Sequence, residues 1–150
     1  EFILNFVIIN ANIPSGSMEN TIMTNDKLIA LRTSYWFNDP KRGDIIIFKY
    51  PDDETEWFIK RVIALPGETV VKDGKVYING SKKALSEPYI KEEPVEDFGP
   101  YKVPKNGYFV MGDNRNNSND AREWETHYVS RDEVLGKAWF RYYPSIKVIK

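Results

Sequence analysis

Two serines that flank a glycine are the first residues in the chain that could do chemistry. Ser15, Gly16 and Ser17 follow an apolar segment at 2–9 that we predict to be a strand. A sharp turn there would present a hydroxyl and backbone N–H groups on one side, which is what a serine nucleophile and the donors for its oxyanion require. An ordinary Gly-Ser turn has the same composition, so the cluster alone leaves both interpretations open.

A lysine and an arginine interrupt a strongly apolar strand candidate at 57–65. Successive side chains of a strand alternate between its faces, so Lys60 and Arg61 lie on opposite faces that are otherwise apolar. A lysine among apolar neighbours loses hydration, and lowering its pKa by about 3 units costs roughly 4 kcal/mol. That cost is understandable if the neutral amine acts as a base. The alternative is an ammonium that reaches solvent at a strand edge.

A polar loop at 112–122 follows the strand candidate at 108–111 and contains a single apolar side chain. Its Asp and Asn content suggests calcium, but Arg115 stands where an EF-hand loop needs an oxygen ligand, and no glutamate occupies the twelfth place. We therefore predict no metal site. His127 is the one imidazole in the chain, and a Ser17–His127 pair is an alternative to a serine–lysine pair that geometry must decide.

Composition narrows the possible functions. The chain has 150 residues, 21 Lys plus Arg, 22 Asp plus Glu, one His and no Cys. Its net charge of −1 argues against a general nucleic-acid binder, and the missing cysteines exclude a thiol nucleophile, a disulfide scaffold and a zinc–thiolate site. We expect a single domain, residues 1–150, without a cofactor and monomeric.

The elements that must position these residues are mostly strands. A hairpin is predicted at 69–78, with its turn at 72–75, and 81–104 reads as a surface excursion because it holds four prolines and an acidic cluster. The spacing of Ser130 and Glu133 predicts a short helix with a capping box, with Gly136 just beyond its end. The remaining strand candidates are 2–9, 27–31, 44–50, 57–65 and 108–111.

Aromatic residues form two further groups. The first is Tyr35, Trp36 and Phe37, which we interpret as an exposed hairpin tip that contacts a membrane surface, because the basic residues Lys41 and Arg42 follow it after Pro40. The alternative is that these rings complete the core. The second group lies on a last strand, where alternation predicts core positions for Trp139, Phe140, Tyr142 and Tyr143. The apolar segment at 2–9 is too short to span a bilayer.

Taken together, these segments resemble the bacterial type I signal peptidases, which use a serine–lysine dyad. The resemblance covers nearly the whole chain and rests on several motifs that occur in this order, each on the element that the chemistry needs. The motifs are Ser15-Gly16-Ser17-Met18, Arg42-Gly43-Asp44, Lys60-Arg61-Val62 followed by Leu65-Pro66-Gly67, and Gly112-Asp113-Asn114-Arg115 through Ser118, Asp120 and Arg122.

Carried over residue by residue, the resemblance implies that Ser17 is the nucleophile and Lys60 its general base. It implies an oxyanion hole made by the backbone N–H of Ser17 and the hydroxyl of Ser15, with Ser118 orienting the amine of Lys60. The other implied site residues are a charged support of Arg61, Asp113, Asp120 and Arg122, and Met18 as a lining residue of the substrate groove.

The resemblance also implies a mainly β catalytic domain of antiparallel sheets, with a small inserted β excursion at about 72–104 and an N-terminal membrane anchor. The domain would face the outside of the cytoplasmic membrane and cleave signal peptides from exported preproteins after a small-x-small pattern. Asn20, Asn116 and Ala121 depart from residues common in the family, which affects loop rigidity and removes no catalytic group. The short excursion is closer to the compact enzymes of Gram-positive bacteria.

Two alternatives remain at this point. A self-cleaving LexA-like protease shares the dyad, but it should carry a DNA-binding segment and an internal cleavage site. A calcium- or ligand-binding β-module that uses the 112–122 loop would be indifferent to the loss of Ser17.

Overall fold

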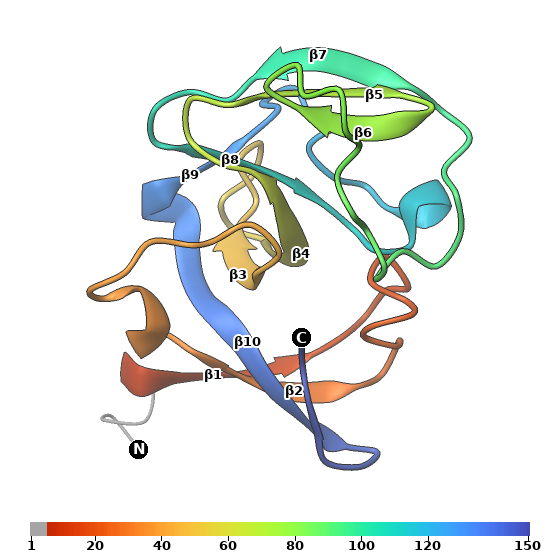
Figure 1. Ribbon diagram of the computed structural model, residues 1–150. Coiled ribbons are helices and arrows are strands. Elements are labelled where there is room, and N and C mark those ends of the chain that lie inside the picture. The colour runs from red at the N-terminus through yellow and green to blue at the C-terminus, as the bar shows by residue number, and fades with distance from the viewer. Residues whose placement is uncertain (1–5) are drawn as a thin grey trace.

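The computed structural model describes residues 6–150 and consists mainly of antiparallel strands (Figure 1). Seven strands of the larger sheet follow the order β1-β2-β10-β3-β4-β8-β9, with β11 beside β10. A smaller sheet, β6-β5-β7, lies at the top of Figure 1. The mainly β prediction is confirmed. The strands are β1 (Ile8–Asn12), β2 (Lys27–Leu31), β3 (Ile45–Lys49), β4 (Trp57–Ala64), β5 (Thr69–Asp73), β6 (Lys75–Ile78), β7 (Phe98–Lys102), β8 (Gly107–Met111), β9 (Val129–Ser130), β10 (Val134–Tyr143) and β11 (Lys147–Val148).

Most strand predictions correspond to observed strands. The candidates at 27–31, 44–50, 57–65 and 108–111 are β2, β3, β4 and β8. The hairpin is β5–β6, and Gly74 makes its turn possible with a φ of +74°. The first candidate is displaced, because β1 begins at Ile8 and residues 2–5 lie outside the described part of the chain.

The excursion at 81–104 is more ordered than predicted. Its last part forms β7, which pairs with β5 and completes the smaller sheet. Pro100 suggested a loop, but a proline is compatible with an edge strand, and β7 is the outer strand of this sheet. The last part of the excursion is therefore a paired strand and not a surface loop.

The predicted helix is a single 3₁₀ turn, η3 (Arg131–Glu133). The capping box is present, since the Glu133 backbone N–H donates to the Ser130 side chain and the Ser130 backbone N–H donates to the Glu133 carboxylate at 2.8 Å. The turn ends because Val134 already has extended geometry and begins β10. Gly136 is not a helix terminator but a strand residue, where a Cβ would lie 2.9 Å from the carbonyl oxygen of Leu31.

The aromatic residues of β10 are not in the core as predicted. Trp139, Tyr142 and Tyr143 are exposed, and Phe140 is half-buried. Figure 1 shows the reason, since the C-terminal half of β10 runs past the body of the domain, with β11 as its short partner. Alternation alone could not reveal that both faces of this half lack a covering layer.

The other aromatic group is only partly exposed. It lies on η1 (Thr33–Tyr35) and the residues after it, and not on a hairpin tip. Tyr35 is buried in the main core and its hydroxyl donates to Asp44 at 2.8 Å, so its predicted membrane contact is wrong. Trp36 is half-exposed and Phe37 is 92% exposed, as the prediction requires.

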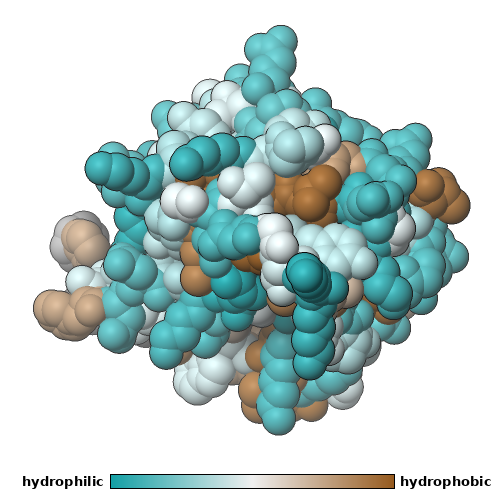
Figure 2. Space-filling model, turned by 45° about the horizontal axis from the view of Figure 1, so that its top comes forward, coloured by the Kyte–Doolittle hydropathy of each residue, from teal (hydrophilic) through white to brown (hydrophobic). Residues whose placement is uncertain are grey.

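The main core lies around β3, β4 and β8, with Phe48, Val62 and Phe109 fully buried. A second cluster beneath the Ser17 turn contains Met18 and Leu28. The face seen in Figure 2 is mainly hydrophilic, with hydrophobic residues scattered over it. Within 6–150, no helix is long and apolar enough to cross a bilayer.

Candidate active site

Ser17 and Lys60 meet although 43 residues separate them in the sequence. The Lys60 Nζ lies 2.9 Å from the Ser17 Oγ, and the two residues are 5% and 6% exposed. Ser17 stands in the turn after β1, and Lys60 stands near the middle of β4. The expected burial of Lys60 is confirmed, and the solvent-exposed alternative is excluded.

Burial controls the protonation of this lysine. Removal from water disfavours the ammonium and lowers the pKa of Lys60 from 10.5 to about 8, and the negative charge of Asp120 opposes part of this shift. The Phe58 ring, whose centroid lies 5.2 Å from Nζ, forms part of the apolar surroundings. A substantial fraction of the amine is therefore neutral near pH 8 and can accept a proton.

The turn that carries Ser17 is anchored from below by Met18. The backbone N–H of Ile22 donates to the carbonyl of Met18 at 2.8 Å, and the Met18 side chain is fully buried beside Ile13 and Leu28. Met18 was predicted to line a substrate groove, and that prediction is wrong. Its side chain points into the core because the turn needs an apolar anchor there.

The 112–122 loop holds the same turn from the other side. The backbone N–H and the side-chain amide of Asn114 donate to the carbonyls of Ser17 and Gly16, both at 2.9 Å. Gly112 packs so closely that a Cβ would overlap the Ser17 carbonyl and the Ser118 hydroxyl. Asn114 belongs to the motif, but sequence reasoning gave it no role, because only the fold places it against the serine turn.

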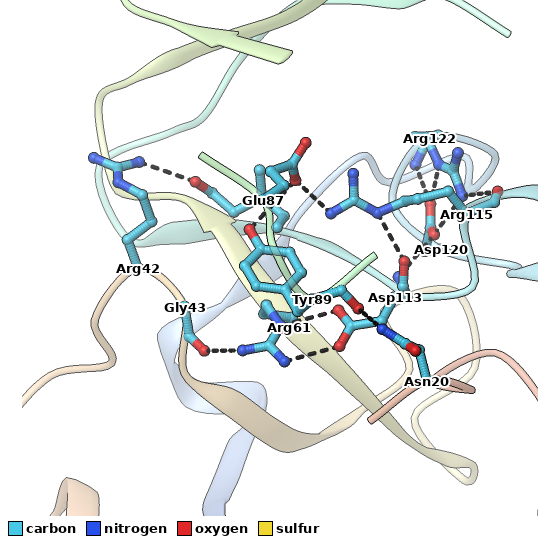
Figure 3. A network of polar contacts seen from close by, with 12 residues as sticks. Asn20, Arg42, Gly43, Arg61, Glu87, Tyr89, Asp113, Arg115, Asp120 and Arg122 are labelled. Atoms are coloured by element: carbon cyan, nitrogen blue, oxygen red, sulfur yellow. Dashed lines mark hydrogen bonds and ion pairs between the residues drawn. The ribbon is translucent and has the colours of Figure 1, made fainter. Parts of the chain in front are cut away.

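Arg61 and Asp113 form a buried ion pair on the far face of β4 (Figure 3). The Arg61 Nε and Nη2 donate to the two Asp113 oxygens at 2.9 and 2.8 Å, and Nη1 donates to the carbonyl of Gly43 at 2.8 Å. Thr21 donates to Asp113 as well, at 2.5 Å. The pair joins the strand of Lys60 to the loop that supports Ser17.

Asp120 and Arg122 brace the loop from within (Figure 3). The Arg122 Nε and Nη2 donate to the two carboxylate oxygens of Asp120 at 2.7 and 2.8 Å. Asp120 also accepts the backbone N–H of Gly112, and Arg122 donates to the carbonyl of Arg115. The ion pair between Arg122 and Asp120 thus stabilises the loop from within. Both carboxylates of the loop, Asp113 and Asp120, are paired with an arginine. Among the described residues, no cluster of acidic and histidine side chains could hold a metal ion.

A short segment of the excursion, residues 87–91, covers this network and was missed by sequence reasoning. The Tyr89 ring lies 4.0 Å from the Arg61 guanidinium carbon, and its carbonyl accepts the side-chain amide of Asn20 at 3.0 Å. Glu87 pairs with Arg115 at 2.6 Å, and the backbone N–H of Lys91 donates to the carbonyl of Asp113. The sequence of this segment has no regular hydrophobic pattern, so it did not indicate these long-range contacts.

Three further residues were predicted from the sequence to act at or near the dyad: Ser15, Ser118 and His127. Ser15 is exposed, and its Oγ lies 3.4 Å from the Ser17 Oγ, close enough to face the same reacting group. Ser118 makes no hydrogen bond to Lys60, since its buried Oγ has no partner among the described residues. His127 stacks on Tyr101, and its Nδ1 lies 2.6 Å from the Ala121 carbonyl, so the alternative Ser17–His127 pair is not formed.

A cleft of about 740 Å³, here called the dyad cleft, ends at Ser17 and Lys60. One wall is β1 and the turn after it, residues 9–17, and the other is the start of β4. Ile9, Ile13, Ile47 and Ile59 make its interior apolar. Asn117 and Asn119 close it at the loop side.

Comparison with known proteins decides the family. The sequence matches the family described as signal peptidase, peptidase S26, over residues 1–143. The chain belongs to this family. Probable signal peptidase I-2 of Synechocystis sp. is 46% identical over 142 residues, which are 91% of this chain and 63% of that protein. Signal peptidase I of Leptolyngbya laminosa is 48% identical over 141 residues, 88% of this chain and 67% of that protein.

A solved structure agrees with the family assignment. The crystal structure of a signal peptidase I from Enterococcus faecalis V583 is 36% identical and superimposes with a TM-score of 0.56, covering 67% of this chain and 97% of that one. The S26 peptidases are serine endopeptidases associated with membranes. The chain spans less than two thirds of the Synechocystis relative.

The first prediction concerns Gly112. In Gly112→Ala the added methyl group must displace the Ser17 carbonyl or Ser118, and this shift misplaces the nucleophile. We expect peptidase activity to fall by about 100-fold or more, since such small displacements cost that much. Initial rates on a signal-peptide substrate, with thermal melting to verify folding, test this expectation. Activity within twofold of wild type would show that the close packing is unimportant.

The second prediction concerns stability. Because the pKa of Lys60 is lowered to about 8, the folded state binds fewer protons than the unfolded chain between pH 8 and 10.5. Below pH 8 the buried ammonium therefore costs roughly 3 kcal/mol, and the cost fades as the pH rises to 10.5. Lys60→Met should be more stable than wild type at pH 6.5 and lose this advantage at pH 10.5.

Guanidinium unfolding at the two pH values measures this difference. Lys75→Met, at an exposed position of β6, is the matched control and should show no such pH-dependent gain. A Lys60→Met variant that is equally or less stable than wild type at pH 6.5 contradicts the account of the buried amine.

Proposed function

We propose that this chain is the catalytic domain of a signal peptidase that cleaves signal peptides from preproteins with Ser17 as nucleophile and Lys60 as general base. The observation that carries the proposal is the 2.9 Å contact between a buried lysine amine of lowered pKa and a serine hydroxyl. Both groups stand at the end of an apolar cleft. A lysine can act as a base near neutral pH only when its pKa is lowered in this way.

In the proposed mechanism, neutral Lys60 takes the proton of Ser17 as the Oγ attacks the carbonyl carbon of the scissile bond. The oxyanion is stabilised by the backbone N–H of Ser17 and the hydroxyl of Ser15, whose Oγ lies 3.4 Å from the nucleophile. Protonated Lys60 then gives the proton to the leaving amine. Water, activated by the same amine, hydrolyses the acyl-enzyme. Orientation of Lys60 by Ser118 stays a prediction.

The proposed substrate binds as an added strand. Within the described chain β1 pairs only with β2, so its other edge has free N–H and C=O groups, and this edge lines the dyad cleft. An extended peptide can pair with such an edge and place alternate side chains in shallow pockets. Signal peptides end in small residues, which suit an apolar cleft close to the backbone of Ser17.

The domain is proposed to work as a monomer at the outer face of the cytoplasmic membrane. Trp36 and Phe37 directly follow η1, and the short helical turn after β2 lies near the start of β1 in Figure 1. The backbone N–H of Arg32 donates to the Val7 carbonyl. Arg32 also lies over the Trp57 ring, which lines the end of the dyad cleft far from Ser17. Aromatic residues favour the membrane interface. A bound signal peptide would thus extend from Ser17 toward the membrane.

The third prediction tests the dyad. Ser17→Ala and Lys60→Ala should each abolish cleavage of a peptide whose signal part ends in Ala-x-Ala, while the fold is kept. In wild type, kcat/KM should fall about tenfold per pH unit below the pKa of about 8, because protonation removes the base. Initial rates between pH 5 and 10 measure this profile.

His127→Ala is the matched control, because His127 makes its contacts away from Ser17. It should keep the wild-type profile. A rate that is constant down to pH 5, or cleavage by Lys60→Ala at the wild-type rate, would rule out the lysine base.

The fourth prediction concerns the membrane. Replacing Trp36 and Phe37 by alanine should reduce co-sedimentation with vesicles that contain anionic lipid, because both rings are exposed. Trp139→Ala, which removes another exposed tryptophan ring on β10, is the control and should bind like wild type. Equal binding by all three proteins would remove the proposed membrane contact.

A further inference from the structure

The end of the dyad cleft far from Ser17 carries an aromatic ring that the mechanism above does not use. Trp57, the first residue of β4, lines the cleft and is 50% exposed. Among the described residues that line the cleft, no other aromatic ring is exposed. The Arg32 guanidinium carbon lies 5.7 Å from the centroid of this ring and helps to hold it in place. Trp57 therefore presents a positioned apolar surface to the cleft.

The Trp57 ring continues the apolar floor of the cleft. Trp57 and Ile59 are two residues apart in one strand, so their side chains lie on the same face of the sheet. Ile59 pairs with Ile47 across the strands and packs against the buried cluster that contains Ile9 and Ile47. All four side chains line the cleft. Apolar side chains are thus present from the neighbourhood of the dyad to the far end of the cleft.

The distance from the dyad to this ring can be expressed in substrate residues. Trp57 lies three residues before Lys60 on β4, which is about 10 Å at about 3.3 Å per residue. On the opposite wall, Ile9 lies four residues before Ile13, which is about 13 Å. A peptide added as a strand has the same rise per residue. Its fourth and fifth residues before the scissile bond therefore reach this end of the cleft, directly beyond the small-x-small pattern.

We propose that Trp57 is a specificity-determining residue that binds an apolar side chain at the fourth or fifth residue before the scissile bond. This inference rests on the proposed signal-peptidase function. A signal peptide has a hydrophobic segment of about 7–15 residues ahead of its cleavage site. Contact with the ring removes apolar surface of both partners from water, which is favourable. Trp57 would thus select substrates whose hydrophobic segment ends directly before the small-x-small pattern.

The test uses soluble synthetic peptides in the absence of lipid, so that binding to a membrane cannot contribute. Their signal part ends in Ala-x-Ala and otherwise consists of serine. One peptide has no leucine, and three have a single leucine at the fourth, fifth or eighth residue before the scissile bond. For wild type we expect leucine at the fourth or fifth residue to raise kcat/KM about three- to tenfold, the effect of one partly buried apolar contact. Leucine at the eighth residue lies beyond the cleft and should give no gain.

Trp57→Ala should bring the ratio of kcat/KM between the leucine and the leucine-free peptides close to one. The contact is remote from the reacting atoms and forms equally in bound substrate and transition state, so the loss should appear in KM and not in kcat. Trp57→Phe should keep most of the gain, because it retains a ring at this position. Trp139→Ala is the matched control, since its ring is 47% exposed and does not line the cleft, and it should keep the whole gain.

Two results would overturn this assignment. Leucine may give the same gain in Trp57→Ala as in wild type, or no gain at either near position in wild type, and then Trp57 does not bind the hydrophobic segment. A fall of kcat for all four peptides with unchanged ratios would instead give the ring a purely structural role. If wild type cleaves none of the peptides, the proposed function itself fails, which is a different result.

Discussion

The contact between the Lys60 amine and the Ser17 hydroxyl depends on keeping water away from the amine. An exposed lysine would be almost wholly charged near pH 8, and a charged amine cannot take the serine proton. Burial lowers the pKa of Lys60 to about 8, and this shift disfavours the folded state at neutral pH. The rest of the domain must therefore hold two groups from distant segments 2.9 Å apart while excluding solvent.

The polar contacts around the dyad meet this requirement by joining neighbouring segments on both faces of β4. Lys60 projects toward Ser17, and the next residue, Arg61, projects into a buried pair with Asp113. Asn114, the residue after Asp113, donates hydrogen bonds to the carbonyls of Gly16 and Ser17. Removing one partner of a buried ion pair leaves an uncompensated charge that costs about 3–5 kcal/mol. A displacement of any one of these segments would thus also displace the Ser17 hydroxyl.

Much of this arrangement could be predicted from the sequence, because its signals are local. Alternation placed Lys60 and Arg61 on opposite faces of one strand, and glycine positions fixed the β5–β6 turn. Contacts between distant segments were not predictable: Tyr89 lies over Arg61 although irregular sequence surrounds it, and Met18 packs inward where a groove residue was expected. The exposed aromatics of β10 were misassigned for a related reason, since a pattern of side chains does not reveal whether another layer covers them.

The central claim is that the Lys60 amine has a lowered pKa, and NMR titration of its side chain tests this directly. Lysines labelled with ¹³C at Cε can be followed from pH 6 to 12, and the Lys60 signal can be assigned by its absence in Lys60→Met. The account predicts a midpoint of about 8 for Lys60, well below the ordinary lysine value of 10.5. A midpoint near 10.5 would mean that the amine is charged at neutral pH, and Ser17 would then lack its base.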